Sequence, residues 1–258
     1  MRIQSIVIVW LVVLFPLNNL PTFGRTGPEP VKTRLAVPQA FDLAPENPAS
    51  VDDYVDAFKV INPNAIKYAL SGYAYLEEQN QIGKKDIITI IDFSKPSTEE
   101  RLYVVNLKTK EILAKSLVAH GRNSGEIYAT KFSNNAESFQ SSLGFYIASE
   151  TYDGKHGSSL RLDGMEAGFN DHARDRGVVV HGADYVSYNF IHATGRLGRS
   201  QGCPALPMSD YQQIISMIKG GSCFFIYNPN KYYLSHSPIL KNYNESALAD
   251  VVSSFNSL

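Results

Sequence analysis

The chain of 258 residues is short of several features that define protein classes. It has only two cysteines, Cys203 and Cys223, too few for a disulfide scaffold or a cysteine-based structural zinc site. Lys plus Arg number 24 against 25 Asp plus Glu, with no block of five or more like charges, so a nucleic-acid interface is not supported. The composition, 44% hydrophobic and 19% charged, excludes a disordered or fibrous chain. We therefore expect a folded protein whose core holds together without disulfides or a structural metal.

Long apolar runs are also scarce, and the longest lies at the N-terminus, from Ile6 to Phe15 after Arg2. Its ten residues reach about 15 Å as a helix, half of a bilayer's hydrocarbon core, which favours a signal peptide over a spanning helix. We expect residues 1–24 to be a signal peptide or N-terminal anchor. No A-x-A site follows, so a cut near Gly24 and an uncleaved anchor both stay open. The pattern predicts an exported protein, periplasmic or associated with the cell envelope, that meets the membrane only through this segment.

The rest of the chain changes twice in composition and hydrophobic pattern. Residues 25–50 are rich in proline and predict a linker, and residues 51–82 carry two helical patterns that predict a helical arm. A strand-rich domain is expected over 83–235, followed by a C-terminal tail over 236–258. The expected helices cover 51–60, 65–79 and 209–218, the last capped by Ser209. The expected strands cover 87–93, 102–106, 112–119, 143–152, 159–162, 177–181 and 223–227.

Cys203 is the first candidate for chemistry, within the segment Gly198-Arg-Ser-Gln-Gly-Cys-Pro-Ala-Leu206. A free thiol has a pKa near 8.5, so a nucleophilic cysteine needs an imidazole or convergent N–H groups beside it. Gly202 permits a tight turn there, in which the N–H groups of Gln201, Gly202 and Cys203 converge on an oxyanion. The alternative is that Cys203 is an ordinary small buried residue, the usual fate of a free cysteine.

Six histidines offer a partner for this thiol. His181 closes the strand Val178-Val-Val-His-Gly182, where a side chain leaves a sheet edge and faces a groove. His120 also closes a strand and is the competing base or a substrate contact. A histidine hydrogen-bonded within the core is the alternative for either. The others are expected in structural or loop positions: His156, His172, His192 and His236.

Other catalytic classes lack their motifs. There is no H-E-x-x-H and no close histidine pair for zinc, and no G-x-S-x-G for a serine hydrolase. Papain-like peptidases place cysteine before histidine, whereas here His181 precedes Cys203. We therefore expect neither a metal nor another cofactor.

Two motifs resemble those of the murein L,D-transpeptidases with a YkuD-type catalytic domain, in a divergent branch. These enzymes carry a strand-borne His-Gly followed after about twenty residues by Ser-x-Gly-Cys, matched here by His181-Gly182 and Ser200-Gln-Gly-Cys203. Upstream, 120–125 and 141–145 match the family's Gly-rich turn and aromatic strand. The likeness covers 87–228. It implies a mainly β (α+β) fold, a YkuD-like β-sandwich with one flanking helix and an N-terminal helical arm.

The resemblance also implies a role for each matching residue. Cys203 is the nucleophile and His181 its base. The carbonyl of Gly182 orients the imidazole, while Ser200 and Gly202 shape the turn and the oxyanion site.

Two departures from the family pattern affect substrate contacts. Gln201 stands where the family usually has histidine, and Pro204-Ala205 stands where it has arginine or asparagine. A carboxylate on the substrate needs another cation, and we expect Arg199 or Arg161 to bind it. The other candidate contacts are His120 and Gln201, with Arg196 and Arg176 behind the two arginines.

The activity implied is acyl transfer on peptidoglycan stem tetrapeptides through a cysteine thioester, with a carbapenem β-lactam as a possible inhibitor. Water as acceptor would instead make the protein an L,D-carboxypeptidase. A non-catalytic cell-wall-binding module and an exported structural protein remain as alternatives of other classes.

Overall fold

The structure is a computed structural model that describes residues 50–154, 157–242 and residue 252. All of them belong to a compact unit that begins at Glu46. The expected signal peptide over 1–24, the expected linker apart from Ser50, and His156 lie outside the described residues.

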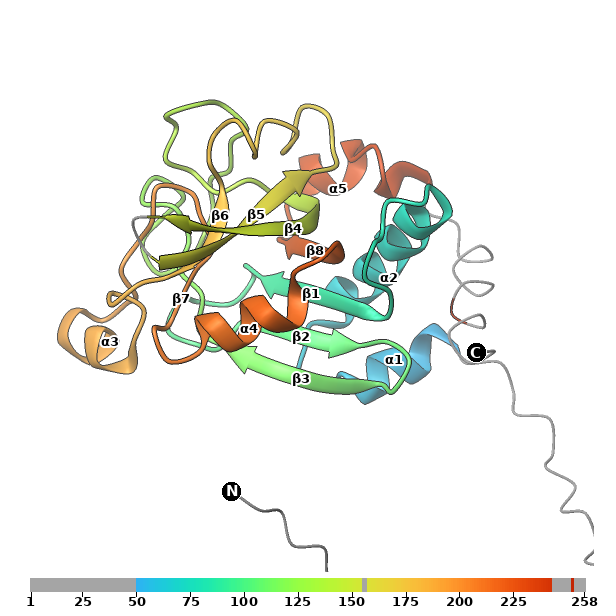
Figure 1. Cartoon of the computed structure of the whole chain (residues 1–258), viewed down its shortest axis with the longest axis horizontal. Helices are drawn as coiled ribbons and strands as arrows, with labels where there is room; N and C mark the ends of the chain where they lie inside the picture. Colours follow the sequence, from blue (N-terminus) through green and yellow to red (C-terminus); the bar gives the residue numbers. More distant parts are fainter. Residues whose placement is uncertain (1–49, 155–156, 243–251, 253–258) are drawn as a thin grey trace, which may run out of the picture. The chain divides into compact units, whose positions relative to one another are not determined.

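A mixed eight-stranded sheet forms the centre of this unit (Figure 1). Its strand order is β3-β2-β1-β8-β4-β5-β6-β7, in which β1 and β8 pair in parallel, as do β6 and β7, and the other pairs are antiparallel. The strands are β1 Ile87–Asp92, β2 Leu102–Asn106, β3 Glu111–Ser116, β4 Gly144–Gly154, β5 Gly157–Gly164, β6 Val179–Gly182, β7 Ala205–Leu206 and β8 Ser222–Tyr227.

Sequence pattern explains the place of each strand in the sheet. All six residues of β1 and all six of β8 are buried, and both strands are mostly β-branched or aromatic, as expected of central strands covered on both faces. In β3 exposed and partly buried residues alternate, so one face meets solvent. The chain after β3 then bridges to the far edge, with Ala119 opposite Ala205 and Gly121 opposite Ser200. The sheet therefore curls into a nearly closed barrel.

Helices cover the sheet. Helix α1 (Val51–Ala57) begins with a capping box between Ser50 and Asp53, and α2 (Pro63–Glu78) begins with proline in its first turn. Helix α2 packs against β1 and β8, and Tyr68 stacks on Tyr227 with ring centroids 6.2 Å apart. The segment expected as an arm is thus part of the same hydrophobic core.

Helix α4 (Tyr211–Ile218) packs against β1, β5 and β6 with four buried residues. Its N-cap is Asp210 rather than the expected Ser209. The side chain of Asp210 accepts hydrogen bonds from Ser116 and Ser209 instead of capping the helix. Three short elements complete the described part: α3 Tyr188–Thr194, α5 Lys231–His236 and a 3-10 turn Leu240–Asn242.

The first residues of the expected tail are held inside the fold. Ser237 is fully buried and donates a hydrogen bond to Glu166, which also accepts from the hydroxyl of Tyr233 at 2.9 Å and from the N–H of Phe145 at 2.7 Å. The mainly β fold with flanking helices is confirmed. None of the helices in the described part is long and apolar enough to cross a membrane.

Candidate active site

Cys203 and His181 are brought together by the pairing of β6 with β7. His181 lies opposite Ala205 in this parallel pair, and Cys203 precedes Ala205 by two residues. Cys203 itself lies in the bend that leads into β7. The pairing thus brings the thiol and the imidazole to the same cavity of about 570 Å³, which both residues line.

Side chains fix the turn that carries Cys203. The hydroxyl of Ser200 accepts from the N–H of Gly202 at 3.0 Å and donates to the carbonyl of Cys203 at 2.6 Å. Gly202 has φ +125°, a conformation that disfavours any residue with a Cβ, and Ser141 donates to its carbonyl at 3.1 Å. Because Gly202 uses its N–H inside the turn, the N–H of Cys203 is the better oxyanion donor.

The thiol of Cys203 is half-buried at the amino end of β6. Its sulfur lies 3.5 Å from the N–H of Val179 and 3.5 Å from the carbonyl of Gly177. Burial raises the pKa of this thiol, and the Val179 N–H and the positive charge of Arg176 oppose that effect. The resting group is a thiol, so attack requires a base.

His181 is positioned as such a base. It is buried, and its Nδ1 lies 2.9 Å from the carbonyl oxygen of Gly182. A carbonyl only accepts, so Nδ1 carries the proton and Nε2 is the acceptor nitrogen of the neutral ring. A Cβ on Gly182 would lie 2.6 Å from the ring of Tyr211 and 2.9 Å from the sulfur of Met208, so packing against α4 requires glycine after the histidine.

His120 is not brought to this cavity. It is 1% exposed, and its Nδ1 accepts from Arg101 at 2.8 Å while Nε2 donates to the carbonyl of Gly125 at 3.2 Å. Burial, together with the charge of Arg101, lowers the pKa of His120 to about 4. The structure thus places His120 as a neutral histidine in the core, outside the set of residues that line the cavity.

The two arginines expected to bind substrate lie differently. Arg199 lines the cavity, although its guanidinium donates to Glu126 at 2.5 Å and to the carbonyl of Gly125 at 3.1 Å. Arg161 lies outside the set of lining residues, where it pairs with Glu150 at 3.3 Å and stacks 4.4 Å over Tyr152, which does line the cavity. Gln201 is exposed and lines the cavity.

Sequence reasoning missed Arg122, which also lines the cavity. Its guanidinium lies 3.9 Å above the ring of Phe139, and no carboxylate of the described residues lies within ion-pair distance. It directly follows His120-Gly121, a motif already singled out, so the position carried a signal. Two tyrosines, Tyr152 and Tyr185, complete the wall and were not foreseen either.

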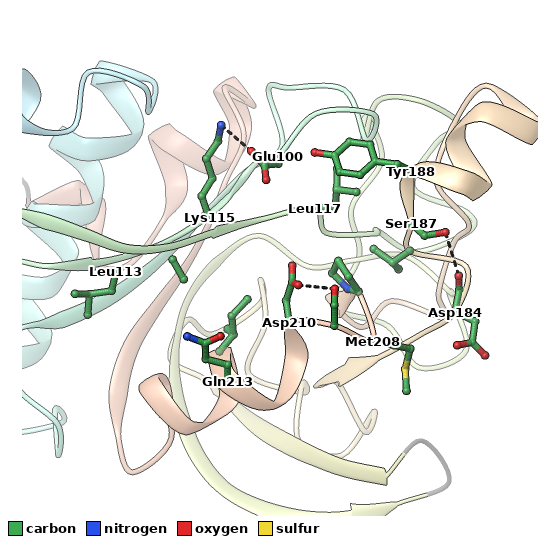
Figure 2. Close-up of a pocket in the computed structure, with 15 residues that line it drawn as sticks. Glu100, Leu113, Lys115, Leu117, Asp184, Ser187, Tyr188, Met208, Asp210 and Gln213 are labelled. Carbon is green, nitrogen blue, oxygen red and sulfur yellow. Dashed lines mark hydrogen bonds and ion pairs between the residues drawn. The ribbon is translucent and has the colours of Figure 1, made fainter.

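A larger cavity of about 690 Å³ lies elsewhere, between β3 and the segments that lead into α3 and α4 (Figure 2). It is lined by Leu113, Tyr188, Met208 and the ion pair of Glu100 with Lys115, whose charged atoms are 2.8 Å apart. It contains neither cysteine nor histidine, whereas the smaller cavity is lined by both Cys203 and His181. Across the described ranges, no three His, Cys, Asp or Glu side chains are grouped to hold a metal.

A family model described as L,D-transpeptidase catalytic domain matches residues 58–227, more than half of the chain. No curated protein matches this chain. Similar solved structures include an L,D-transpeptidase from Mycobacterium smegmatis, which is 15% identical in sequence. The match covers 55% of this chain and 59% of that chain, with a TM-score of 0.35.

Two further solved structures are similar to the same share of this chain. A mutant of Enterococcus faecium L,D-transpeptidase has 10% identity, with 55% of this chain and 50% of that chain covered and a TM-score of 0.33. L,D-transpeptidase 3 from Mycobacterium tuberculosis, solved in complex with a faropenem-derived adduct, has 12% identity, 55% and 60% coverage and a TM-score of 0.32. The match thus spans between half and 60% of these three chains.

Proposed function

The chain belongs to the L,D-transpeptidase catalytic domain family, and from this premise we propose that it is a peptidoglycan-modifying cysteine acyltransferase. The observation that carries the proposal is that His181 and Cys203 line one open cavity, with Nδ1 of His181 held by the Gly182 carbonyl. The proposed donor is a stem tetrapeptide of peptidoglycan.

In the first step Nε2 of His181 takes the proton from the thiol of Cys203 as the sulfur attacks the carbonyl carbon of the third stem residue. The oxyanion that forms is stabilised by the N–H of Cys203. The C–N bond to the terminal D-amino acid then breaks, and the imidazolium returns the proton to the leaving amine. The product is a thioester on Cys203.

In the second step an amine of another stem attacks the thioester, the C–S bond breaks, and His181 carries the proton back to the sulfur. The new amide is a cross-link. With water as acceptor, the same two residues would act as an L,D-carboxypeptidase. Both acceptors use the same cavity, so the alternative concerns the product and not the site.

A cation near the nucleophile is needed for the terminal carboxylate of the donor. Arg199 and Arg161 are the two residues proposed to bind this carboxylate. Arg199 is the stronger candidate, because it lines the cavity and Arg161 does not. Arg122 is the added candidate, since its charge has no carboxylate partner in the described part of the chain and its stacking on Phe139 pre-orients it.

The N-terminal segment supports a proposal about location. An apolar run of ten residues suits export, and the proposed substrate lies outside the cytoplasm. Fractionation of cells expressing the full chain would place it in the envelope or periplasm, and recovery in the cytosol would refute the proposal.

The decisive test incubates the full chain with a defined stem tetrapeptide, with and without an amine-bearing acceptor, and identifies the products by mass. We expect release of the terminal D-amino acid and, with acceptor, a cross-linked dimer. Cys203→Ala should abolish both products, while Cys223→Ala, whose buried thiol lies on β8, is the matched control. Binding of the peptide without any turnover would instead support a wall-binding module.

A further inference from the structure

Arg176, in the segment before β6, organises a loop that adjoins the nucleophile. Its half-buried guanidinium donates to the carbonyls of Ser133 and Gln140, each at 2.8 Å. It also donates to the hydroxyls of Ser142 at 2.5 Å and Ser138 at 3.3 Å. One side chain thus fixes both ends of the segment 133–142.

The same guanidinium lies against the turn that carries Cys203. A Cβ placed on Gly202 would be 3.5 Å from a terminal nitrogen of Arg176 and 2.8 Å from the Gln140 carbonyl that this nitrogen binds. Cys203 is the next residue, and the positive charge of Arg176 lowers the pKa of its thiol against the effect of burial.

The charge of Arg176 is not neutralised nearby. No carboxylate of the described residues forms an ion pair with it, whereas Arg174, two residues earlier, is paired with Glu150 and Asp163. A half-buried cation without a counter-ion stabilises an anion that forms beside it. When the thiol loses its proton, that anion is the sulfur of Cys203.

We propose that Arg176 is a positioning residue for the nucleophile: its charge stabilises the thiolate of Cys203, and its hydrogen bonds hold the segment 133–142 against the Cys203 turn. This inference rests on the proposed role of Cys203 as nucleophile. It assigns to a residue 27 positions before the cysteine both the electrostatic and the structural support of the attacking sulfur.

Other charged and titratable groups face the same sulfur and must be held constant. Arg199 is neutralised by Glu126, and Arg122 is exposed, so solvent and salt screen its charge. Burial raises the pKa of Tyr185 to about 12, which keeps its hydroxyl neutral over the relevant range, and Tyr152 is the other phenol of the wall. The imidazole of His181 lines the same cavity, so the measured midpoint is assigned to the pair of Cys203 and His181.

The test measures the rate of alkylation of Cys203 by iodoacetamide against pH, followed by intact-protein mass. Arg176→Gln should move the midpoint upward by about one pH unit, as expected for loss of a neighbouring charge. At neutral pH a tenfold smaller thiolate fraction is partly offset by a more nucleophilic thiolate, so the rate should fall about threefold.

Arg176→Lys separates the two roles. The ammonium keeps the charge, so the alkylation midpoint should stay near that of the wild type. A lysine cannot reproduce the four hydrogen bonds of the guanidinium, so kcat/KM for the stem peptide should fall. Arg174→Gln is the matched control, because it removes an equal charge from the same segment where two carboxylates already neutralise it. Its midpoint and activity should be unchanged.

An unshifted midpoint in folded Arg176→Gln, or an equal shift in Arg176→Lys, would overturn the role of the charge. Unchanged kcat/KM in Arg176→Lys would overturn the role of the hydrogen bonds. Circular dichroism establishes that each variant is folded, and Cys203→Ala shows which thiol is alkylated. If even the wild type neither turns over stem peptide nor forms a carbapenem adduct, the proposed function fails, while the alkylation midpoints still decide the role of Arg176.

Discussion

Acidification from pH 7 to pH 5 is expected to destabilise the protein by about 2 kcal/mol through His120 alone. The pKa of His120 falls from its usual 6.5 to about 4 in the folded protein, because the ring is buried beside the guanidinium of Arg101. At pH values between these two pKa values, His120 is protonated in the unfolded chain and neutral in the folded chain. Stability is therefore lost as the pH falls through this window, by about 3 kcal/mol once the window is crossed.

The matched variant for this test is His120→Asn. An amide oxygen can accept from Arg101 as Nδ1 does, but it does not titrate. Urea unfolding followed by circular dichroism at pH 7, 6, 5 and 4 gives the free energy of unfolding of both proteins. Glu166, whose pKa is raised by burial, acts with the opposite sign, and it cancels because both proteins contain it. Equal losses in wild type and variant would refute the reasoning.

The remaining predictions concern the cavity. Cys203→Ala should abolish turnover, while Cys223→Ala should keep it and lose about 1 kcal/mol of stability, as measured by product mass and urea unfolding. An inactive but folded Cys223 variant would contradict this assignment. A carbapenem should give one covalent adduct by intact mass, absent in Cys203→Ala, and no adduct after long incubation would favour the wall-binding module. Arg199→Ala or Arg161→Ala should raise KM tenfold or more, since a charge-assisted hydrogen bond contributes about 1.5–3 kcal/mol, while the adduct still forms. Unchanged KM in both would leave Arg122 or backbone N–H groups to bind the carboxylate.

The central strands could be predicted because their own residues require burial. The runs Ile87–Asp92 and Ser222–Tyr227 are mostly β-branched or aromatic, and the structure buries every residue of both. Strand β7 could not be predicted, because Ala205–Leu206 is two residues long and follows a proline. It is defined by its pairing with β6 and by the bridge from Ala205 to Ala119, which no local pattern encodes.

The two candidate catalytic residues, Cys203 and His181, could be selected from the sequence because both lie in short motifs. The residues that hold them in place could not be predicted, because their hydrogen bonds join positions that are far apart in the sequence. Ser141 reaches the Gly202 carbonyl across 61 positions, and Arg176 reaches Ser133 across 43. The burial of His120 could not be predicted either: its motif suggested a substrate contact, and the structure shows a guanidinium from Arg101 against its ring in the core.

The turn that carries Cys203 therefore depends on supports that lie far from it in the chain. No strand includes it, so Ser141 fixes the carbonyl of Gly202, and the His120 carbonyl accepts the N–H of Ser200 at 3.0 Å. An attacking sulfur must be placed within a fraction of an ångström to react well. Substitutions at Ser141 should consequently lower kcat without altering the thiol itself, because they loosen the turn and leave the cavity wall intact.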